Sequence, residues 1–403
     1  MHNSGPKIAS ARYGGAHTPD SLTTDFKAFA PGVSAHIDRP GGLAQECAMS
    51  DHPSDSHTIW QPPHIAPTDR KIETAMRARI DGKAKPPGSL GRIEDLAVHL
   101  ATMAHPQAPC INKAVLLIFA GDHGLVEDGV SQYPSAVTVT MVNTYLAGRA
   151  CANAFAFANS IDVRVVDAGV DTEFPPHPGL INAKIRRGTA NAAVEPAMSK
   201  ADAAQALARG CQIAIDETAG GADIIALGEM GIGNTASSAL ILHRLAPAEL
   251  DACIGIGAGQ DEAGMARKRA ALVKAAARSN ASDPLDVLRE FGGFEIAMLA
   301  GAVLGAASRR CPVVIDGFIT TAAALIAVRL CPAARDYCIF AHHSAERGHD
   351  IALNALDAKP LLSLDLRLGE GTGALLAIPL IRAASRLLTD VADLSDILAG
   401  KAG

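Results

Sequence analysis

The sequence predicts an α/β protein with a buried, mainly parallel sheet. From about residue 112 onward, short apolar runs alternate with Ala-rich stretches of helical pattern. The runs are continuously apolar rather than alternating, which is typical of strands that are covered on both faces. Hydrophobic residues make up 48% of the 403-residue chain and charged residues 19%, which is enough apolar material for one large core.

The first expected element is a helix that begins at Thr68 or Asp69 and runs through Ile80. Either side chain can cap it, because both accept hydrogen bonds from the free amides of a first helical turn. Six apolar runs follow as expected strands, at residues 114–119, 163–167, 224–227, 253–256, 313–315 and 337–341. Ligands of parallel sheets bind at the carboxyl ends of the strands, so the loops after these runs form the candidate site.

Residues 1–66 differ from the rest of the chain. They are rich in His, Ser, Pro, Gly and Asp, hold six of the fourteen histidines, and show no sustained apolar period. A solvated, disordered extension is favoured over a metal-binding tail, because the histidine spacings are irregular.

Composition and charge argue against several classes of function. The net charge is −6 and aromatic residues make up 4%, so neither a basic footprint nor a stacking surface for nucleic acid is expected. No apolar run reaches the roughly 18 residues of a membrane span, and the first residues lack the apolar core of a secretory signal. Eight scattered cysteines without a CxxC pair are typical of reduced thiols. A cytoplasmic location without membrane or nucleic-acid partners is therefore expected.

The loop after residues 114–119 places Asp122 beside His123. This pair could serve acid–base or metal chemistry, but an Asx-type turn is favoured on spacing alone. Further on, Tyr133 and Met141 combine an aromatic ring and a thioether, which suits a flat apolar ligand. Packing in the core accounts for these two residues nearly as well.

Four later loops offer groups that can bind phosphate. Residues 228–235 hold three glycines before an expected helix start, where backbone amides favour an anion. Glu229 is unusual there unless it faces a ribose or a base, and a structural role is the alternative. Residues 255–259 are followed by Lys268 on a helix, although a basic triplet is more often a solvated face. Gly317 follows one strand and Ser344 another, and a hydroxyl at that place can donate to phosphate.

Glu370 stands between two glycines in residues 366–373. A carboxylate in such a turn can be held at the edge of a cleft, and burial would raise its pKa towards the range of a general base. A solvated glutamate in a Gly-rich turn is the alternative. Taken together, the loops indicate a site for a phosphorylated, sugar-like ligand.

In their order, the loops resemble those of the nicotinate-nucleotide–dimethylbenzimidazole phosphoribosyltransferase family. The resemblance covers residues 85 to about 391, and its motifs are residues 85–91, 121–124, 195–198, 228–235, 292–295, 315–318, 344–346 and 367–373. It implies a doubly wound, mainly parallel, Rossmann-like sheet with a smaller helical domain formed from both ends of the matching region. The expected boundaries are an extension at 1–66, a large α/β domain at 111–345, and the two parts of the small domain at 67–110 and 346–403, the latter carrying the catalytic loop.

The resemblance also implies roles for particular residues. Glu370 matches the catalytic glutamate, and Glu229 matches a second active-site glutamate near the ribose and the base. The positions that hold the substrate phosphate match Gly231, Lys268, Gly317 and Ser344. The slot for the incoming benzimidazole matches Tyr133, Met141 and Leu368. The position of Met141 varies within the family, which leaves the accepted base open.

These roles imply transfer of phosphoribose from nicotinate mononucleotide to dimethylbenzimidazole, yielding α-ribazole 5′-phosphate and nicotinate for the lower ligand of cobalamin. The reaction requires no metal or cofactor, and members of the family are homodimers. Two alternatives stay open. A Rossmann-type oxidoreductase would need a GxGxxG loop after the first strand, where residues 120–124 differ. A catalytically silent binding protein would be expected to lack Glu370 or Lys268.

Overall fold

The computed structural model describes residues 60–104, 109–257 and 259–401. Six strands form one parallel sheet in the order β3-β2-β1-β4-β5-β6. They are β1 (Ala114–Gly121), β2 (Asp162–Gly169), β3 (Leu180–Asn182), β4 (Ile224–Met230), β5 (Val313–Ile315) and β6 (Cys338–Phe340). The strand order reverses between β1 and β4, so the loops at their carboxyl ends diverge and leave a crevice. The predicted doubly wound α/β class is confirmed.

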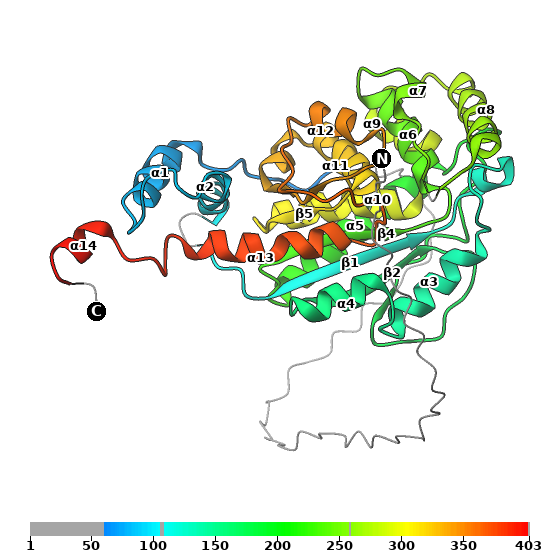
Figure 1. Cartoon of the computed structure of the whole chain (residues 1–403). Helices are drawn as coiled ribbons and strands as arrows, with labels where there is room; N and C mark the ends of the chain where they lie inside the picture. The colour runs from blue at the N-terminus through cyan, green and yellow to red at the C-terminus, as the bar shows by residue number, and fades with distance from the viewer. Residues whose placement is uncertain (1–59, 105–108, 258, 402–403) are drawn as a thin grey trace, which may run out of the picture. The chain divides into compact units, whose positions relative to one another are not determined.

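Helices cover both faces of this sheet (Figure 1). One face is covered by α10 (Phe294–Ser308) and α11 (Phe318–Leu330), with α5 (Lys200–Ala219) packed against α10. The other face is covered by α3 (Ala136–Leu146), α4 (Cys151–Ala158) and α13 (Thr372–Arg386). The helices α5 and α10 touch through their backbones, since a Cβ at Gly301 would lie 2.1 Å from the carbonyl oxygen of Leu207. The Ala- and Gly-rich composition therefore serves close packing between helices.

The remaining elements are shorter or lie at the ends of the chain. The other helices are α1 (Glu73–Asp81), α2 (Arg92–Ala104), α6 (Asn234–Leu245), α7 (Leu250–Cys253), α8 (Glu262–Arg278), α9 (Pro284–Phe291), α12 (His349–Ala355) and α14 (Leu394–Leu398). The described ranges also contain the 3₁₀ turns η1 (Arg70–Ile72), η2 (Gly124–Asp128) and η3 (Pro332–Tyr337). A second small sheet pairs β7 (His342–His343) with β8 (Leu362–Ser363).

Five of the six predicted strands are present, and the strand predicted at residues 253–256 is wrong. That run forms the end of α7 and an irregular segment, although Cys253 and Ile254 are both buried. The sheet leaves no place for it, because β4 is already flanked by β1 and β5. The short edge strand β3 was not predicted, since its residues are only partly buried and show no long apolar run. The helix expected near Thr68 begins as η1, where Asp69 accepts a hydrogen bond from the Lys71 amide at 3.0 Å.

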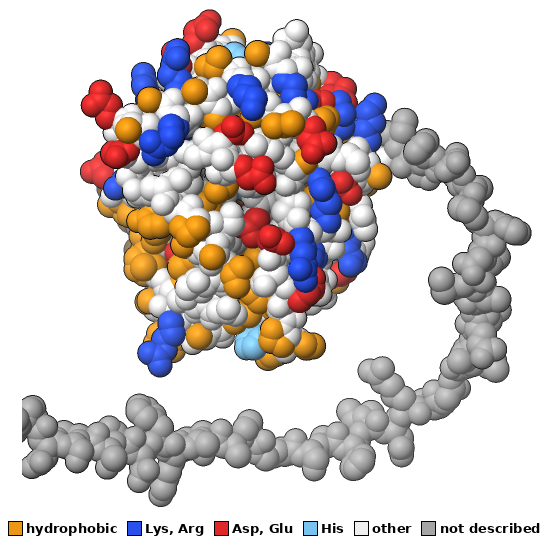
Figure 2. Space-filling model, turned by 90° about the vertical axis from the view of Figure 1, so that its right-hand side faces the viewer, with side chains coloured by type: hydrophobic (Ala, Val, Ile, Leu, Met, Phe, Trp, Pro, Cys, Tyr) orange, Lys and Arg blue, Asp and Glu red, His pale blue; other side chains and the backbone are white. Residues whose placement is uncertain are grey.

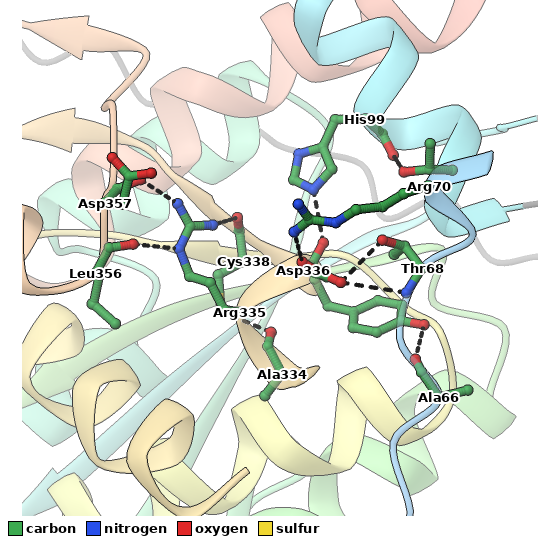
Figure 3. Close-up of polar contacts among 12 residues, drawn as sticks. Ala66, Thr68, Arg70, His99, Ala334, Arg335, Asp336, Cys338, Leu356 and Asp357 are labelled. Carbon is green, nitrogen blue, oxygen red and sulfur yellow. Dashed lines mark hydrogen bonds and ion pairs between the residues drawn. The ribbon is translucent and has the colours of Figure 1, made fainter. Parts of the chain in front are cut away.

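The segment before α1 is anchored on η3 (Figure 3). The Asp336 carboxylate accepts from the Thr68 hydroxyl at 3.1 Å and from Arg70 at 3.0 Å, and the Tyr337 hydroxyl donates to the Ala66 carbonyl at 2.7 Å. Ile65 is buried in the core. Of the extension expected at residues 1–66, residues 1–59 lie outside the described residues. The last part of the extension is described, and Ile65 and Ala66 are packed against the domain.

We expect Asp336→Ala to lower the free energy of unfolding by about 1–3 kcal/mol, because the amide and hydroxyl of Thr68 both lose their acceptor. Arg70→Ala is the control. Its loss should be smaller, because the Arg70 side chain is 77% exposed and such ion pairs contribute little. Urea unfolding followed by circular dichroism measures both. An equal decrease in the free energy of unfolding for the two variants would show that the hydrogen bonds from Thr68 to Asp336 do not stabilise the fold.

Both ends of the described chain meet in one helical region. The Lys83 ammonium pairs with Asp393 at 3.0 Å, and the Leu394 amide donates to the Gly82 carbonyl at 2.9 Å. Figure 1 shows α1, α2 and α14 together beyond one end of the sheet. We propose that these contacts mark the small domain expected from residues 67–110 and 346–403. Among the residues described, no helix is long and apolar enough to cross a membrane.

Candidate active site

A cavity of about 410 Å³ opens at the carboxyl ends of β4 and β5. Its walls come from the loops that follow β4, β5 and β6, from α8, and from the loop before α13. Figure 2 views this edge of the molecule and shows acidic side chains gathered around a central hollow. A cavity of this size suits a ligand of nucleotide dimensions. It is lined by all nine predicted site residues: Tyr133, Met141, Glu229, Gly231, Lys268, Gly317, Ser344, Leu368 and Glu370.

Lys268 is the buried cation of the cavity, with a residue exposure of 1%. Its ammonium donates to the Thr235 hydroxyl at 3.0 Å and to the Gly255 carbonyl at 2.8 Å. Burial lowers the pKa of Lys268 to about 8, against the opposing effect of the Glu346 carboxylate. Arg267 and Arg269 are exposed on the same helix. The solvated face that was the alternative for this basic triplet therefore holds for the two arginines and not for Lys268.

Two further predicted phosphate positions, Gly317 and Ser344, are joined by His349. The Ser344 amide donates to Nδ1 of His349 at 2.8 Å, and Nε2 of His349 lies 2.9 Å from the Thr321 hydroxyl. That hydroxyl donates to the Gly317 carbonyl at 2.7 Å. Burial lowers the pKa of His349 to about 3, so the ring is neutral and can accept at Nδ1 while it donates at Nε2. The backbone at both positions is thereby held in one arrangement.

Four buried carboxyl groups among the described residues line the cavity: Glu229, Asp316, Glu346 and Glu370. Burial raises the pKa of Glu229 to about 8, and the neighbouring carboxylates, Asp316 first among them, add to this effect. The Asn234 amide donates to Glu229 and opposes the shift. Burial likewise raises the pKa of Asp316 to about 7, although backbone amides such as that of Ala374, at 2.8 Å, stabilise its charge. The carboxyl groups of Glu229 and Asp316 therefore retain protons at neutral pH.

Glu370 lies in a turn of three consecutive residues with left-handed backbone angles. Its φ is 62°, and those of Gly369 and Gly371 are 83° and 80°. Residue 369 must also be a glycine because any side chain there would clash with Glu229: a Cβ would lie 2.2 Å from Oε1 of that carboxyl group. The turn therefore brings the Gly369 backbone against the Glu229 carboxyl, and the residue exposure of Glu370 is only 6%. The solvated glutamate that was the alternative interpretation is excluded.

The Glu370 carboxyl meets the end of α3 and the start of α4. Oε2 accepts from the Ala152 amide at 3.3 Å, and the buried Tyr145 hydroxyl lies beside the carboxyl group. Burial raises the pKa of Glu370, while these two donors lower it. The net result is a carboxylate that is more basic than an ordinary glutamate yet held in place, as a general base requires.

Apolar side chains line the outer part of the cavity. Tyr133 is 44% exposed and Leu368 is 55% exposed, which is unusual for large apolar residues, while Met141 packs partly against the core. Exposed apolar groups at the wall of a cavity offer contact area to a flat ligand. Core packing, the alternative for Tyr133, does not account for its exposure.

Two residues of the cavity wall, Asp316 and Asn234, were not predicted, and the Asx-type turn favoured for Asp122 is not the contact that the structure shows. Asp316 directly follows a predicted strand, which was a usable signal, but only the adjacent Gly317 was assigned a role. The Oδ2 atom of Asp122 accepts a hydrogen bond from the Asp171 amide at 2.8 Å, and Asp171 lies 49 residues further along the chain. This contact is not a local turn. Across the described ranges, no group of three or more His, Cys, Asp or Glu side chains is placed to hold a metal ion.

Comparisons with known proteins find relatives over most of the chain. A family described as phosphoribosyltransferase matches residues 65–397. The nicotinate-nucleotide–dimethylbenzimidazole phosphoribosyltransferase of Cupriavidus necator is 47% identical over 334 residues, covering 83% of this chain and 96% of that protein. The enzyme of the same name from Aromatoleum aromaticum is 48% identical, covering 81% and 96%. A crystal structure of the Thermus thermophilus enzyme superimposes with a TM-score of 0.77 at 42% identity, covering 83% of this chain and 99% of that one.

Proposed function

Because the chain belongs to the nicotinate-nucleotide–dimethylbenzimidazole phosphoribosyltransferase family, we propose that it transfers phosphoribose from nicotinate mononucleotide to dimethylbenzimidazole. The products are α-ribazole 5′-phosphate, used in the lower ligand of cobalamin, and nicotinate. One observation supports this most strongly. A single cavity holds a buried lysine beside glycine loops, buried carboxyl groups, and an exposed apolar wall. These are the groups that phosphate, a ribose cation and a flat base require.

Glu370 is the proposed general base. It takes the N–H proton of the benzimidazole while the other ring nitrogen forms a bond to the anomeric carbon. The bond from that carbon to the pyridinium nitrogen breaks, and its electron pair stays on nicotinate. The leaving group is cationic before the reaction, so no acid is needed to expel it. Attack from the opposite face converts a β linkage into an α linkage.

Glu229 and Asp316 are the proposed neighbours of the sugar. Positive charge develops on the ribose in the transition state, and preorganised anionic groups stabilise such charge. Lys268, with the backbone near Gly231 and Gly317 and the Ser344 hydroxyl, would hold the phosphate. Tyr133, Met141 and Leu368 would form the slot for the base.

The reaction is tested by incubating the protein with nicotinate mononucleotide and dimethylbenzimidazole and following both products by chromatography. We expect nicotinate and the phosphoribosylated benzimidazole to appear in equal amounts. Omitting the benzimidazole is the control, and nicotinate release should then fall to background. Binding of the nucleotide without turnover would identify a silent binding protein instead.

We propose that the enzyme is a cytoplasmic homodimer. The seven cysteines among the described residues form no disulfide, which fits a reducing compartment. Leu394, Ile397 and Leu398 on α14 are exposed apolar side chains, and a second copy could cover them. Sedimentation of the full chain measures the oligomeric state.

We expect nicotinate mononucleotide to bind with release of a proton at neutral pH. Before the substrate binds, Glu229 has a pKa of about 8 and is mostly protonated. The cationic pyridinium of the substrate favours the ionised form, so the pKa falls and the proton leaves. Calorimetry in buffers of different ionisation enthalpy measures this proton. Glu229→Gln should reduce the release, and proton uptake by the wild type at neutral pH would contradict the placement of Glu229 beside the pyridinium.

A further inference from the structure

His123 and Glu295 form a buried ion pair that the proposed mechanism does not use. His123 lies in the loop after β1 and Glu295 in the first turn of α10, with 2.5 Å between Nε2 and Oε1. The side chains are 2% and 0% exposed. Burial alone lowers the pKa of His123, but Glu295, and to a smaller extent Asp122, outweigh it and raise the pKa. The Glu295 carboxylate therefore favours the charged form of the His123 ring.

Three glycines close around this pair. A Cβ at Gly231 would lie 2.5 Å from the Gly121 carbonyl oxygen and 3.4 Å from Oε1 of Glu295. A Cβ at Gly293 would lie 2.4 Å from Cε1 of His123, and one at Gly121 would lie 2.7 Å from Oε2 of Glu295. The loops after β1 and β4 and the loop before α10 thus pack directly on the pair. Gly231 is the member of this group that lines the cavity.

The same turn is held from a second direction by α3. The Ile232 amide donates to the Thr138 hydroxyl at 3.2 Å, and Thr138 is fully buried. Thr138 in turn contacts the Asp122 carboxyl group, the neighbour of His123 in the chain. The backbone at Gly231 and Ile232 therefore lies between the ion pair and a buried hydroxyl, which leaves it little freedom to move.

Stability alone does not explain the pair. A buried ion pair often contributes no more to folding than apolar residues of the same shape. Within the described part of the chain, Oε2 of Glu295 has no hydrogen-bond partner, so the desolvation of this carboxylate is incompletely offset. An arrangement that is costly in this way indicates a requirement for position.

We propose that His123 and Glu295 are positioning residues that hold the backbone at Gly231 and Ile232 in the conformation that receives the substrate phosphate. The inference rests on the proposed function of the cavity. It also accounts for residues 121–124 and 292–295, two motifs that carried the family resemblance without a chemical role.

Glu295→Gln tests the proposal, because it keeps the shape of the side chain and removes its charge. We expect the Kd for nicotinate mononucleotide to rise about 10-fold or more, while that for the nucleoside lacking the phosphate changes less than about 2-fold. The KM for the nucleotide should rise with kcat largely kept. Glu290→Gln is the matched control, because Glu290 is a buried glutamate paired with Arg278 at 2.5 Å and does not line the cavity. It should lower the Tm without selective loss of the nucleotide.

Equal weakening of both ligands by Glu295→Gln, or no weakening of either, would overturn the inference. If this variant does not fold, Glu295→Asp provides the same test, because the shorter side chain keeps its charge but withdraws the carboxylate from Nε2 of His123. The same selective loss is expected, and its absence would count against the proposal. A wild-type protein that does not bind the nucleotide at all would instead refute the proposed function.

Discussion

Glu370→Gln is expected to remove nearly all turnover while leaving the binding of nicotinate mononucleotide largely intact. Loss of a general base typically lowers the rate by about 10²–10⁴-fold, whereas the proposed phosphate contacts lie elsewhere in the cavity. Glutamine has the same length and the same backbone demands as glutamate, so the left-handed turn at residues 369–371 should survive. Steady-state kinetics and calorimetry of the nucleotide measure the two effects separately.

Asp365→Asn is the matched control for this variant. Asp365 lies in the same loop, is exposed, and also has a positive φ of 55°. Its amide variant should keep wild-type kinetics. A Glu370→Gln protein that retains more than about a tenth of the wild-type rate would show that another group takes the proton.

The pH profile gives an independent test of Glu370. The base must be ionised to act, and burial raises its pKa in the folded protein. Activity should therefore disappear, as the pH falls, at a higher pH than an ordinary glutamate with a pKa of about 4.3 would require. An acid limb of kcat/KM at or below that ordinary value would contradict the assignment.

Lys268→Ala is expected to weaken the binding of nicotinate mononucleotide by about 10- to 150-fold, because a charge-assisted contact with phosphate is lost. The nucleoside that lacks the phosphate should bind both proteins almost equally. The burial of Lys268 sets a pH dependence as well: with a pKa of about 8, it loses its charge as the pH rises through that value. Wild-type affinity for the nucleotide should fall in the same range.

Arg267→Ala and Arg269→Ala are the controls for Lys268. Successive residues of a helix point about 100° apart, and both arginines are exposed, with Arg269 paired to Asp251 at 2.7 Å. Calorimetric titration of the nucleotide and the nucleoside against all three variants compares them. Equal decreases in affinity at the three positions, or for the two ligands, would contradict the proposal that Lys268 binds the substrate phosphate.

Much of the fold follows from local patterns in the sequence. The continuous apolar runs at β1, β4 and β5 predict buried parallel strands, because only strands covered on both faces need apolar residues at every position. The same reasoning fails at residues 253–256, which are equally apolar over a similar length. Apolar residues are enough for burial, but a strand also needs an adjacent strand whose backbone groups are still free to pair with it. The local sequence does not show whether such a strand is available.

Local sequence patterns are enough to predict the α/β class, the loops in which the site residues lie, and the family that they resemble. Which residues of those loops face the cavity, and in what protonation state, depends on how the chain folds. Lys268 and Arg267 are adjacent and alike in charge, yet the packing of α8 buries the first and exposes the second. The protonation of Glu229 and the burial of Glu370 depend on carboxylates and amides from segments far away in the chain. Charge and burial at one residue are set by neighbours in space, and those neighbours exist only when the sheet has brought the loops together.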